Sequence, residues 1–170
     1  MPLDNEKEKK TLTGTRQFST FYLGDRLYGI DVMQVQEVTK PMPVTAVPLA
    51  PPYVQGLINL RGQIATAIGL NELFGVKASE INEKMTVVCR TEGELFSLLV
   101  DRIGDVIEVA KKDFEESPDT LSSEIRQFMV GVYKTEGPIL SVIGVDKIFS
   151  KLNENVVGPS VQSKKEIRGN

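Results

Sequence analysis

The 170-residue sequence contains no histidine, no tryptophan and a single cysteine. Without histidine the chain lacks the usual general base, the Ser–His and Cys–His catalytic pairs and most zinc sites. One cysteine cannot form an internal disulfide, which fits a reducing compartment. A hydrolase built on carboxylates would need a paired-carboxylate signature, and none is present. We therefore expect a protein that is not an enzyme and that uses neither a metal nor a cofactor.

Other absences narrow the class further. No apolar run approaches the ~18–20 residues of a membrane span, and residues 1–10 lack the apolar segment of a secretory signal. The net charge is −3; residues 1–16 and 154–170 each carry +1, which leaves −5 for residues 17–153. An acidic body disfavours contact with a phosphate backbone. A nucleic-acid-binding double β-barrel stays open as an alternative, but it would require a basic face with exposed aromatic side chains.

The most patterned stretch runs from Gly56 to Leu70. Apolar side chains recur there with the period of two that is typical of a half-buried strand, at Ile58, Leu60, Ile64, Ile68 and Leu70. If Leu60 and Ile64 share a face across a turn, the loop holds the three residues 61–63, with Gly62 at the position of positive φ. The pattern predicts a hairpin with an apolar floor and Arg61 at its tip.

The remainder of the chain reads as short strands and turns between two polar ends. We expect residues 1–16 to be a disordered arm and residues 154–170 a disordered tail. Asp31 is placed to cap a short helix in which Val32, Val35 and Val38 share one face. Cys89 lies in an apolar run and is expected to be a buried small hydrophobe.

The chain also repeats itself with an offset of 75 residues. Gly56 aligns with Gly131 and Gly62 with Gly137, and four further identities follow without a gap: Ile64 with Ile139, Ile68 with Ile143, Gly69 with Gly144 and Phe74 with Phe149. Two copies of one unit are therefore expected, spanning about residues 18–75 and 85–150. Each copy holds about five strands, and units this small close into barrels to avoid open edges. Two such barrels need a shared hydrophobic seam, and a seam creates a groove.

These motifs resemble the CheW family of chemotaxis coupling proteins. The resemblance rests on Gly56–Leu70, on the Gly-Asp-Arg-Leu-Tyr-Gly-Ile-Asp-Val run of residues 24–32, on residues 35–38 and on Val100–Val109. It implies an all-β fold with a few short helices, made of two SH3-like five-stranded β-barrels, with a domain over residues 17–153. It also implies a cytoplasmic adaptor without catalytic activity, recruited to receptor arrays. Such an adaptor couples the hairpin tips of chemoreceptors (methyl-accepting chemotaxis proteins) to the regulatory domain of a CheA-type histidine kinase.

The resemblance implies two partner surfaces. A groove between the barrels would take the receptor tip, and the matching positions are Val35, Glu37, Val38, Asn59, Arg61, Gly62, Val87 and Val106. Barrel ends would contact the kinase, at Gly56 and around Leu98. Within the groove set, the opposite charge of Glu37 leaves two roles open: it orients Arg61 or it pairs with the partner.

The chain departs from the family pattern in the second half of the Gly56–Leu70 stretch. Thr66 stands where the family usually has Pro, and Gly69 where it usually has Asp; Ala65 and Ala67 are smaller than the usual Val or Ile. The tip charge also differs between the two copies, because Arg61 aligns with Glu136. Both copies keep a glycine next to that position, so we expect the turn to require the glycine and the function to require the arginine.

Overall fold

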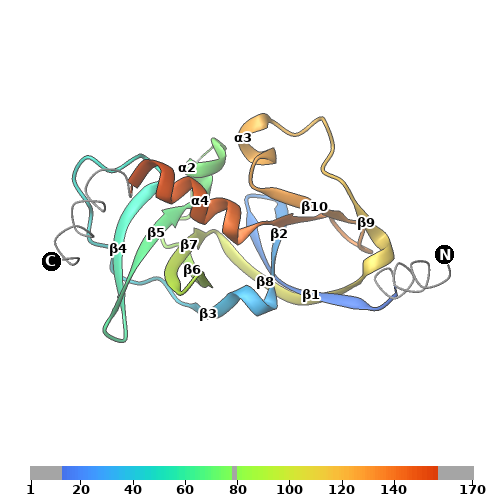
Figure 1. Cartoon of the computed structure of the whole chain (residues 1–170), viewed down its shortest axis with the longest axis horizontal. Helices are drawn as coiled ribbons and strands as arrows, with labels where there is room; N and C mark the ends of the chain where they lie inside the picture. The colour runs from blue at the N-terminus through green and yellow to red at the C-terminus, as the bar shows by residue number, and fades with distance from the viewer. Residues whose placement is uncertain (1–12, 78–79, 157–170) are drawn as a thin grey trace, which may run out of the picture.

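The computed structural model describes residues 13–77 and 80–156. It is mostly β, with two sheets lying next to each other along the long axis and a few short helices (Figure 1). Of the expected disordered ends, residues 1–12 and 157–170 lie outside the described residues. The rest of that expectation is wrong: Thr15 and Arg16 begin a strand, and residues 154–156 belong to a helix.

The two sheets contain six and five strands. The six-stranded sheet has the order β8-β1-β2-β11-β10-β9 and the five-stranded sheet the order β3-β6-β7-β5-β4. The strands of the first are β1 (Thr15–Leu23), β2 (Arg26–Asp31), β8 (Arg102–Ala110), β9 (Phe114–Glu115), β10 (Met129–Tyr133) and β11 (Leu140–Ile143). Those of the second are β3 (Val35–Thr39), β4 (Val54–Leu60), β5 (Gln63–Gly69), β6 (Met85–Thr91) and β7 (Glu94–Val100). The helices are η1 (Val32–Gln34), α2 (Leu70–Phe74), η2 (Lys111–Asp113), α3 (Ser123–Arg126) and α4 (Val145–Val156).

The sheets do not follow the two halves of the sequence. The β1–β2 hairpin of the first half joins strands β8 to β11 of the second half, and the β6–β7 hairpin of the second half joins β3, β4 and β5 of the first. Four pairs make these joins: the parallel pairs β2–β11 and β5–β7 and the antiparallel pairs β1–β8 and β3–β6. The expected two-unit, all-β architecture is present, but neither copy folds on its own segment, and among the described strands neither sheet closes into a full ring. The exchange makes each sheet depend on both halves of the chain.

The internal repeat is visible in the geometry. The β4–β5 ladder shifts register between Val54 and Gly56, and the β10–β11 ladder shifts between Met129 and Gly131, 75 residues later. Facing each glycine, a crossing segment pairs with the strand: Thr45 bridges Leu57, and Glu115 pairs with Val132. A Cβ on Gly56 would overlap the Thr45 carbonyl, and one on Gly131 would overlap the Phe114 ring. The 75-residue offset between the two glycines therefore reflects the same close approach of a crossing segment, made once in each copy.

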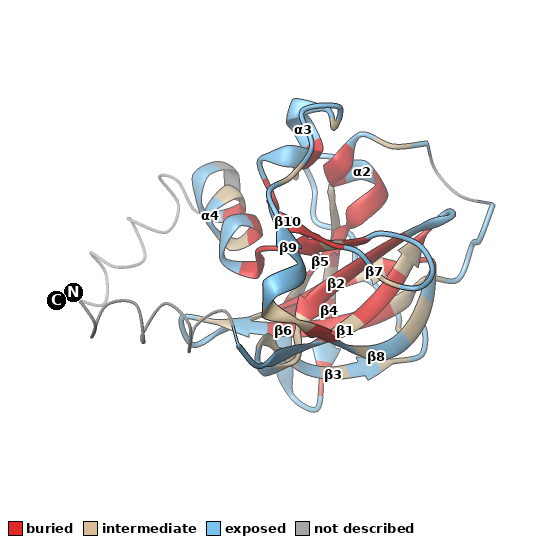
Figure 2. Cartoon of the chain, turned by 90° about the vertical axis from the view of Figure 1, so that its right-hand side faces the viewer, coloured by how far each residue is buried: buried red, intermediate tan, exposed pale blue. Residues whose placement is uncertain are grey.

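One hydrophobic core is shared by both sheets, as the seam requires. It joins Phe21 and Tyr28 of the six-stranded sheet to Phe96 and Leu98 of the five-stranded sheet. Helices α2, α3 and α4 each contribute buried side chains to it, and Figure 2 shows the buried faces of α2 and α4 turned toward the strands. Helix α4 contributes Val145, Ile148 and Leu152, so packed side chains continue past residue 150, where the second copy was expected to end. The amphipathic spacing of these α4 residues was present in the sequence and was missed there.

The helix expected after Asp31 is shorter than its valine spacing suggested. Asp31 caps it as predicted, because its carboxylate accepts from Met33 N at 3.0 Å, but the 3₁₀ turn ends at Gln34. Val35–Thr39 is strand β3 and pairs with β6. β-branched residues have only fair helix propensity, and pairing with β6 supplies the backbone hydrogen bonds that a longer helix would have made.

The hairpin of the first patterned stretch also turns more tightly than expected. Leu60 pairs with Gln63, so the loop holds two residues, Arg61 and Gly62, with φ of 53° and 87°. Two positive φ values define the type I′ turn, whose twist matches the flanking strands. A loop shorter by one residue moves the second strand to the opposite face. Ile64 is therefore 59% exposed, and Ala65 is buried against Ile58 instead.

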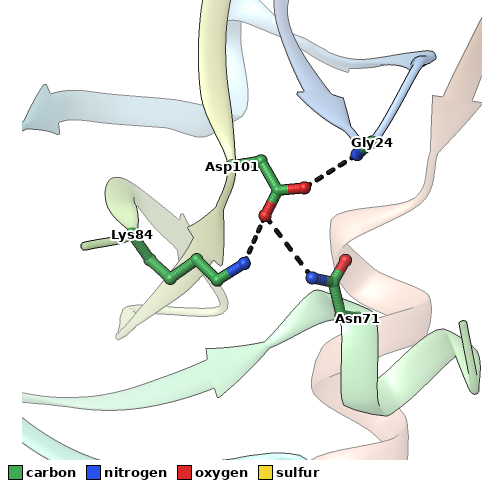
Figure 3. Close-up of polar contacts among 4 residues, drawn as sticks. All are labelled: Gly24, Asn71, Lys84 and Asp101. Carbon is green, nitrogen blue, oxygen red and sulfur yellow. Dashed lines mark hydrogen bonds and ion pairs between the residues drawn. The ribbon is translucent and has the colours of Figure 1, made fainter. Parts of the chain in front are cut away.

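Asp101 joins the two sheets at the point where β7 gives way to β8 (Figure 3). Its side chain is 2% exposed. Oδ2 accepts from Gly24 N in the β1–β2 turn at 2.7 Å; Oδ1 accepts from Asn71 Nδ2 of α2 at 3.4 Å and from Lys84 Nζ ahead of β6. A buried carboxylate is tolerated when charge and hydrogen bonds compensate it. Asp101 thus fastens segments from both sheets at one point.

Replacing Asp101 by Ala should destabilise the fold strongly. The substitution leaves the Lys84 ammonium without this counter-charge and the Gly24 amide without its acceptor, so we expect the free energy of unfolding to fall by about 3 kcal/mol. Urea denaturation measures the change. Asp105→Ala, at an exposed position on β8, is the matched control and should stay within about 0.5 kcal/mol of the unsubstituted chain. Equal effects of the two substitutions would contradict this role.

Cys89 is fully buried, as expected, and burial raises the pKa of its thiol to about 12. The unfolded thiol ionises near its ordinary pKa of about 8.5. The folded chain therefore retains a proton that the unfolded chain loses, and stability should fall as the pH rises through this window. Between pH 8 and pH 10 we expect the chain to lose roughly 2 kcal/mol more than Cys89→Ala loses. Urea midpoints at the two pH values test this, and parallel losses would refute it.

Candidate partner-binding site

Arg61 and Glu37 meet across the open side of the five-stranded sheet. Arg61 lies at the tip of the β4–β5 hairpin and Glu37 lies on β3. The hairpin and β3 are at opposite ends of the strand order of this sheet. Arg61 Nη2 donates to Glu37 Oε2 at 3.1 Å. Of the two roles that the sequence left open for Glu37, this structure shows the pairing with Arg61. The ion pair brings together two segments that are 24 residues apart in the sequence.

The two members of the pair are exposed to very different degrees. The Arg61 side chain is 80% exposed, whereas that of Glu37 is only 20% exposed. Glu37 Oε1 is buried and accepts no hydrogen bond from the described residues. An ion pair this open to solvent contributes little stability, about 0–1 kcal/mol. Its consequence is geometric: it holds a guanidinium with most of its donors facing solvent at a fixed edge.

Asn59 and Gly62 shape the tip on which Arg61 stands. Asn59 Oδ1 accepts from Gly62 N at 2.9 Å, and Gly62 has the positive φ that the second turn position requires. Both residues are exposed. The structure therefore assigns them a part in positioning Arg61, and the local sequence Asn-Leu-Arg-Gly explains the shape of the turn.

Apolar side chains lie exposed on the edge strands of both sheets. Val38 on β3 is 38% exposed and Val106 on β8 is 62% exposed. Met33, in the 3₁₀ turn just before β3, is 89% exposed and was not singled out from the sequence. The sequence feature that could have indicated Met33 is its position in the short turn capped by Asp31. Both views place β3 and β8 along the same, lower side of the molecule (Figures 1 and 2).

Three of the expected contact residues are buried. Val87 is 1% exposed and Leu98 is 0% exposed, so neither side chain can reach a partner in this structure. Val87 pairs with Val38 on β3, and Leu98 sits in the parallel β5–β7 seam. Gly56 is also buried, behind Thr45. These positions support the surfaces from beneath, which a motif read along the sequence cannot distinguish from direct contact.

The small residues of β5 face the interior as well. Ala65 and Ala67 pack with Ile58, and Met42, Leu95 and Leu99 lie against this cluster. Thr66 is half-buried, and Gly69 leaves room for the Glu72 carboxylate. The departures at these positions therefore change the packing behind the hairpin and leave its exposed tip unaltered.

The described residues contain neither a metal cluster nor a membrane-spanning helix. No three acidic or cysteine side chains among them gather closely enough to hold a metal ion. None of the helices in this part of the chain is long and apolar enough to span a membrane.

Comparison with known proteins agrees with this arrangement. The CheW-like domain family matches residues 17–153. The chemotaxis protein CheW of Rhizobium meliloti is 32% identical over 142 residues, covering 83% of this chain and 92% of the relative. That of Helicobacter pylori is 30% identical over 155 residues, covering 86% and 93%. The crystal structure of the scaffolding protein TtCheW from Thermoanaerobacter tengcongensis superposes with a TM-score of 0.70 at 29% identity, over 78% of this chain and 90% of that one. The chain belongs to the CheW family of chemotaxis adaptor proteins.

Proposed function

We propose that this adaptor couples chemoreceptor hairpin tips to a CheA-type histidine kinase, and that it performs no chemistry itself. The observation that carries the proposal is the Arg61–Glu37 pair, held across the open side of a sheet with Arg61 exposed. A solvent-facing arginine on a tight, preorganised turn offers a rigid fork of donors. Receptor tips are helical, and their acidic side chains and free carbonyls would accept from that fork.

The surroundings of the pair suit a helical partner. Val38 on β3 and Val106 on β8 are exposed apolar side chains, and the two strands lie along the same lower side of the molecule (Figure 1). A helix could bury its apolar stripe against such surface. Together these features would fix the orientation of a receptor tip, because the donors of Arg61 and the apolar surface lie at different points of the molecule.

The coupling would be geometric. Because each sheet contains strands from both halves of the chain, a shift at β3 or β8 is transmitted through the shared core. The kinase regulatory domain would bind elsewhere on the adaptor, so that one molecule holds two partners in fixed register at cytoplasmic receptor arrays. Gly56 and Leu98 would influence that surface only indirectly, since both are buried.

Substitution of Arg61 should weaken receptor binding without unfolding the adaptor. Arg61→Ala removes the exposed donors and should raise the Kd for a soluble receptor hairpin about tenfold, equivalent to about 1.4 kcal/mol. Arg61→Glu should weaken binding further, because it reverses the charge next to Glu37. Isothermal titration calorimetry measures both. Arg126→Ala, which removes an exposed arginine paired with Asp119 on the other unit, is the matched control.

Two outcomes separate the site from the function. Unchanged receptor affinity in Arg61→Ala and Arg61→Glu would reject the site while leaving the coupling role intact. If the unsubstituted chain binds neither a receptor hairpin nor the regulatory domain of a CheA-type kinase, the function itself is rejected. Thermal unfolding of each variant, expected within a few degrees of the unsubstituted chain, shows that lost binding is not lost folding.

A further inference from the structure

Among the described residues, Met33 is the methionine that lies open to solvent. It is 89% exposed, whereas Met42 and Met85 are half-buried and Met129 is 3% exposed. A thioether has no proton to titrate, so an oxidant reaches the methionines in the order of their accessibility. Met33 is therefore the methionine at which this chain should be oxidised first.

The turn that carries Met33 lies where the two sheets meet. The turn η1 follows β2 of the six-stranded sheet, precedes β3 of the five-stranded sheet, and contacts β1 and β6, one strand from each sheet. Figure 1 shows it on the lower side, between β3 and β8. Asp31 Oδ1 accepts from Met33 N and fixes the backbone there. Met33 thus belongs to the same side of the molecule as Val38 and Val106, the apolar part of the proposed receptor site.

A hydroperoxide converts the side chain of Met33 into a sulfoxide. A lone pair of the sulfur attacks a peroxide oxygen, so that an S–O bond forms and the O–O bond breaks. With hydrogen peroxide, the departing hydroxide takes the proton of the transferred oxygen and leaves as water. The sulfur is oxidised by two electrons and the peroxide is reduced by two. The flexible apolar side chain becomes a polar one, and methionine sulfoxide reductases reverse the change.

A polar cavity next to Met33 offers donors to a sulfoxide. The cavity has a volume of about 450 Å³, and its walls include Met33, Arg16, Asp31, Glu108 and Lys111. Arg16 is engaged with Asp31 at 2.8 Å, whereas Lys111 takes part in none of the ion pairs of the described residues. A thioether sulfur is only a weak acceptor. The more strongly accepting sulfoxide oxygen could take a hydrogen bond from the Lys111 ammonium, which the thioether cannot do well.

We propose that Met33 is an oxidation-sensitive contact of this adaptor: a hydroperoxide lowers its affinity for a receptor tip, and a sulfoxide reductase restores it. The inference rests on the proposed receptor site. In the reduced state Met33 presents a flexible, polarizable surface that adapts to the apolar stripe of a helix. In the oxidised state the same contact would strip water from a polar oxygen. The cavity donors stabilise that oxygen in the free adaptor, so both effects favour the unbound state.

Limited treatment of the full chain with hydrogen peroxide, followed by peptide mass spectrometry, tests the selectivity. Met33 should gain one oxygen before Met42, Met85 and Met129 do. A saturating concentration of a soluble receptor hairpin should slow the oxidation of Met33, because the partner covers it. The rate at Met42 should stay the same, which makes Met42 the internal reference for a change in peroxide concentration.

Isothermal titration calorimetry with the receptor hairpin tests the consequence. Peroxide treatment should raise the Kd of the unsubstituted chain about tenfold, and sulfoxide reductase with a thiol reductant should return it to its starting value. Met33→Leu has no sulfur at this position, so its Kd, whatever its starting value, should be the same before and after treatment. Met42→Leu is the matched control and should keep the tenfold response. Lys111→Ala should reduce the response, because it removes the donor for the sulfoxide. Thermal unfolding of each treated sample checks that the fold is intact.

Three results would overturn the proposal. They are oxidation of Met42 or Met85 as early as Met33, an equal Kd before and after treatment, and a rise in Kd that persists in Met33→Leu. A full response in Lys111→Ala would reject the part assigned to the cavity. If the untreated chain binds the hairpin and the treated chain binds it equally well, only this inference fails. If the untreated chain does not bind the hairpin at all, the receptor-coupling function is rejected, and this inference falls with it.

Discussion

The exchange of hairpins between the two halves of the chain is the constraint on which the rest of the structure depends. The parallel pairs β2–β11 and β5–β7 join segments from different copies, so neither sheet is complete until both copies are present. Asp101 reinforces the join, because its carboxylate binds Gly24 of one sheet and Asn71 and Lys84 beside the other. A single shared core follows from this exchange, and it gives the adaptor one rigid frame for several surfaces.

That frame places the exposed features on its edges. Arg61 and Glu37 meet because β3 and the β4–β5 tip curl toward each other at opposite ends of one sheet. The second copy does not reproduce the pair. Its β10–β11 connection spans residues 134–139 and is not a tight turn, and its ion pair is Lys134 with Glu115. Gly137 has no positive φ, so the expectation that both copies need the glycine for the turn is wrong for the second.

Three positions have backbone geometry that most residues rarely adopt or tolerate: Gly56, Gly131 and Leu49. Gly56 and Gly131 each allow a crossing segment to approach the strand closely, and only glycine fits at these positions. Their spacing of 75 residues could therefore be recognised in the sequence. Leu49 also has a positive φ, at the centre of a turn that Ala50 N closes onto Val47 O, and its side chain is fully exposed. In the sequence it was one apolar residue among several prolines. Only its dihedral angle and its exposure set it apart.

The sequence by itself determined the two-copy all-β architecture and the family, because periodicity and repeat offset are local or pairwise signals. Opposite charge made the pairing of Arg61 with Glu37 one of two alternatives and could not choose between them. Tertiary structure decided the rest. Strand exchange could not be predicted, since hydrophobic alternation is the same whichever sheet a hairpin joins. Nor could the burial of Val87 and Leu98, or the exposure of Ile64, because one residue of turn length reverses which face a strand presents. Whether a side chain is exposed depends on how the strands pair in the assembled sheets, and the residue type alone does not determine it.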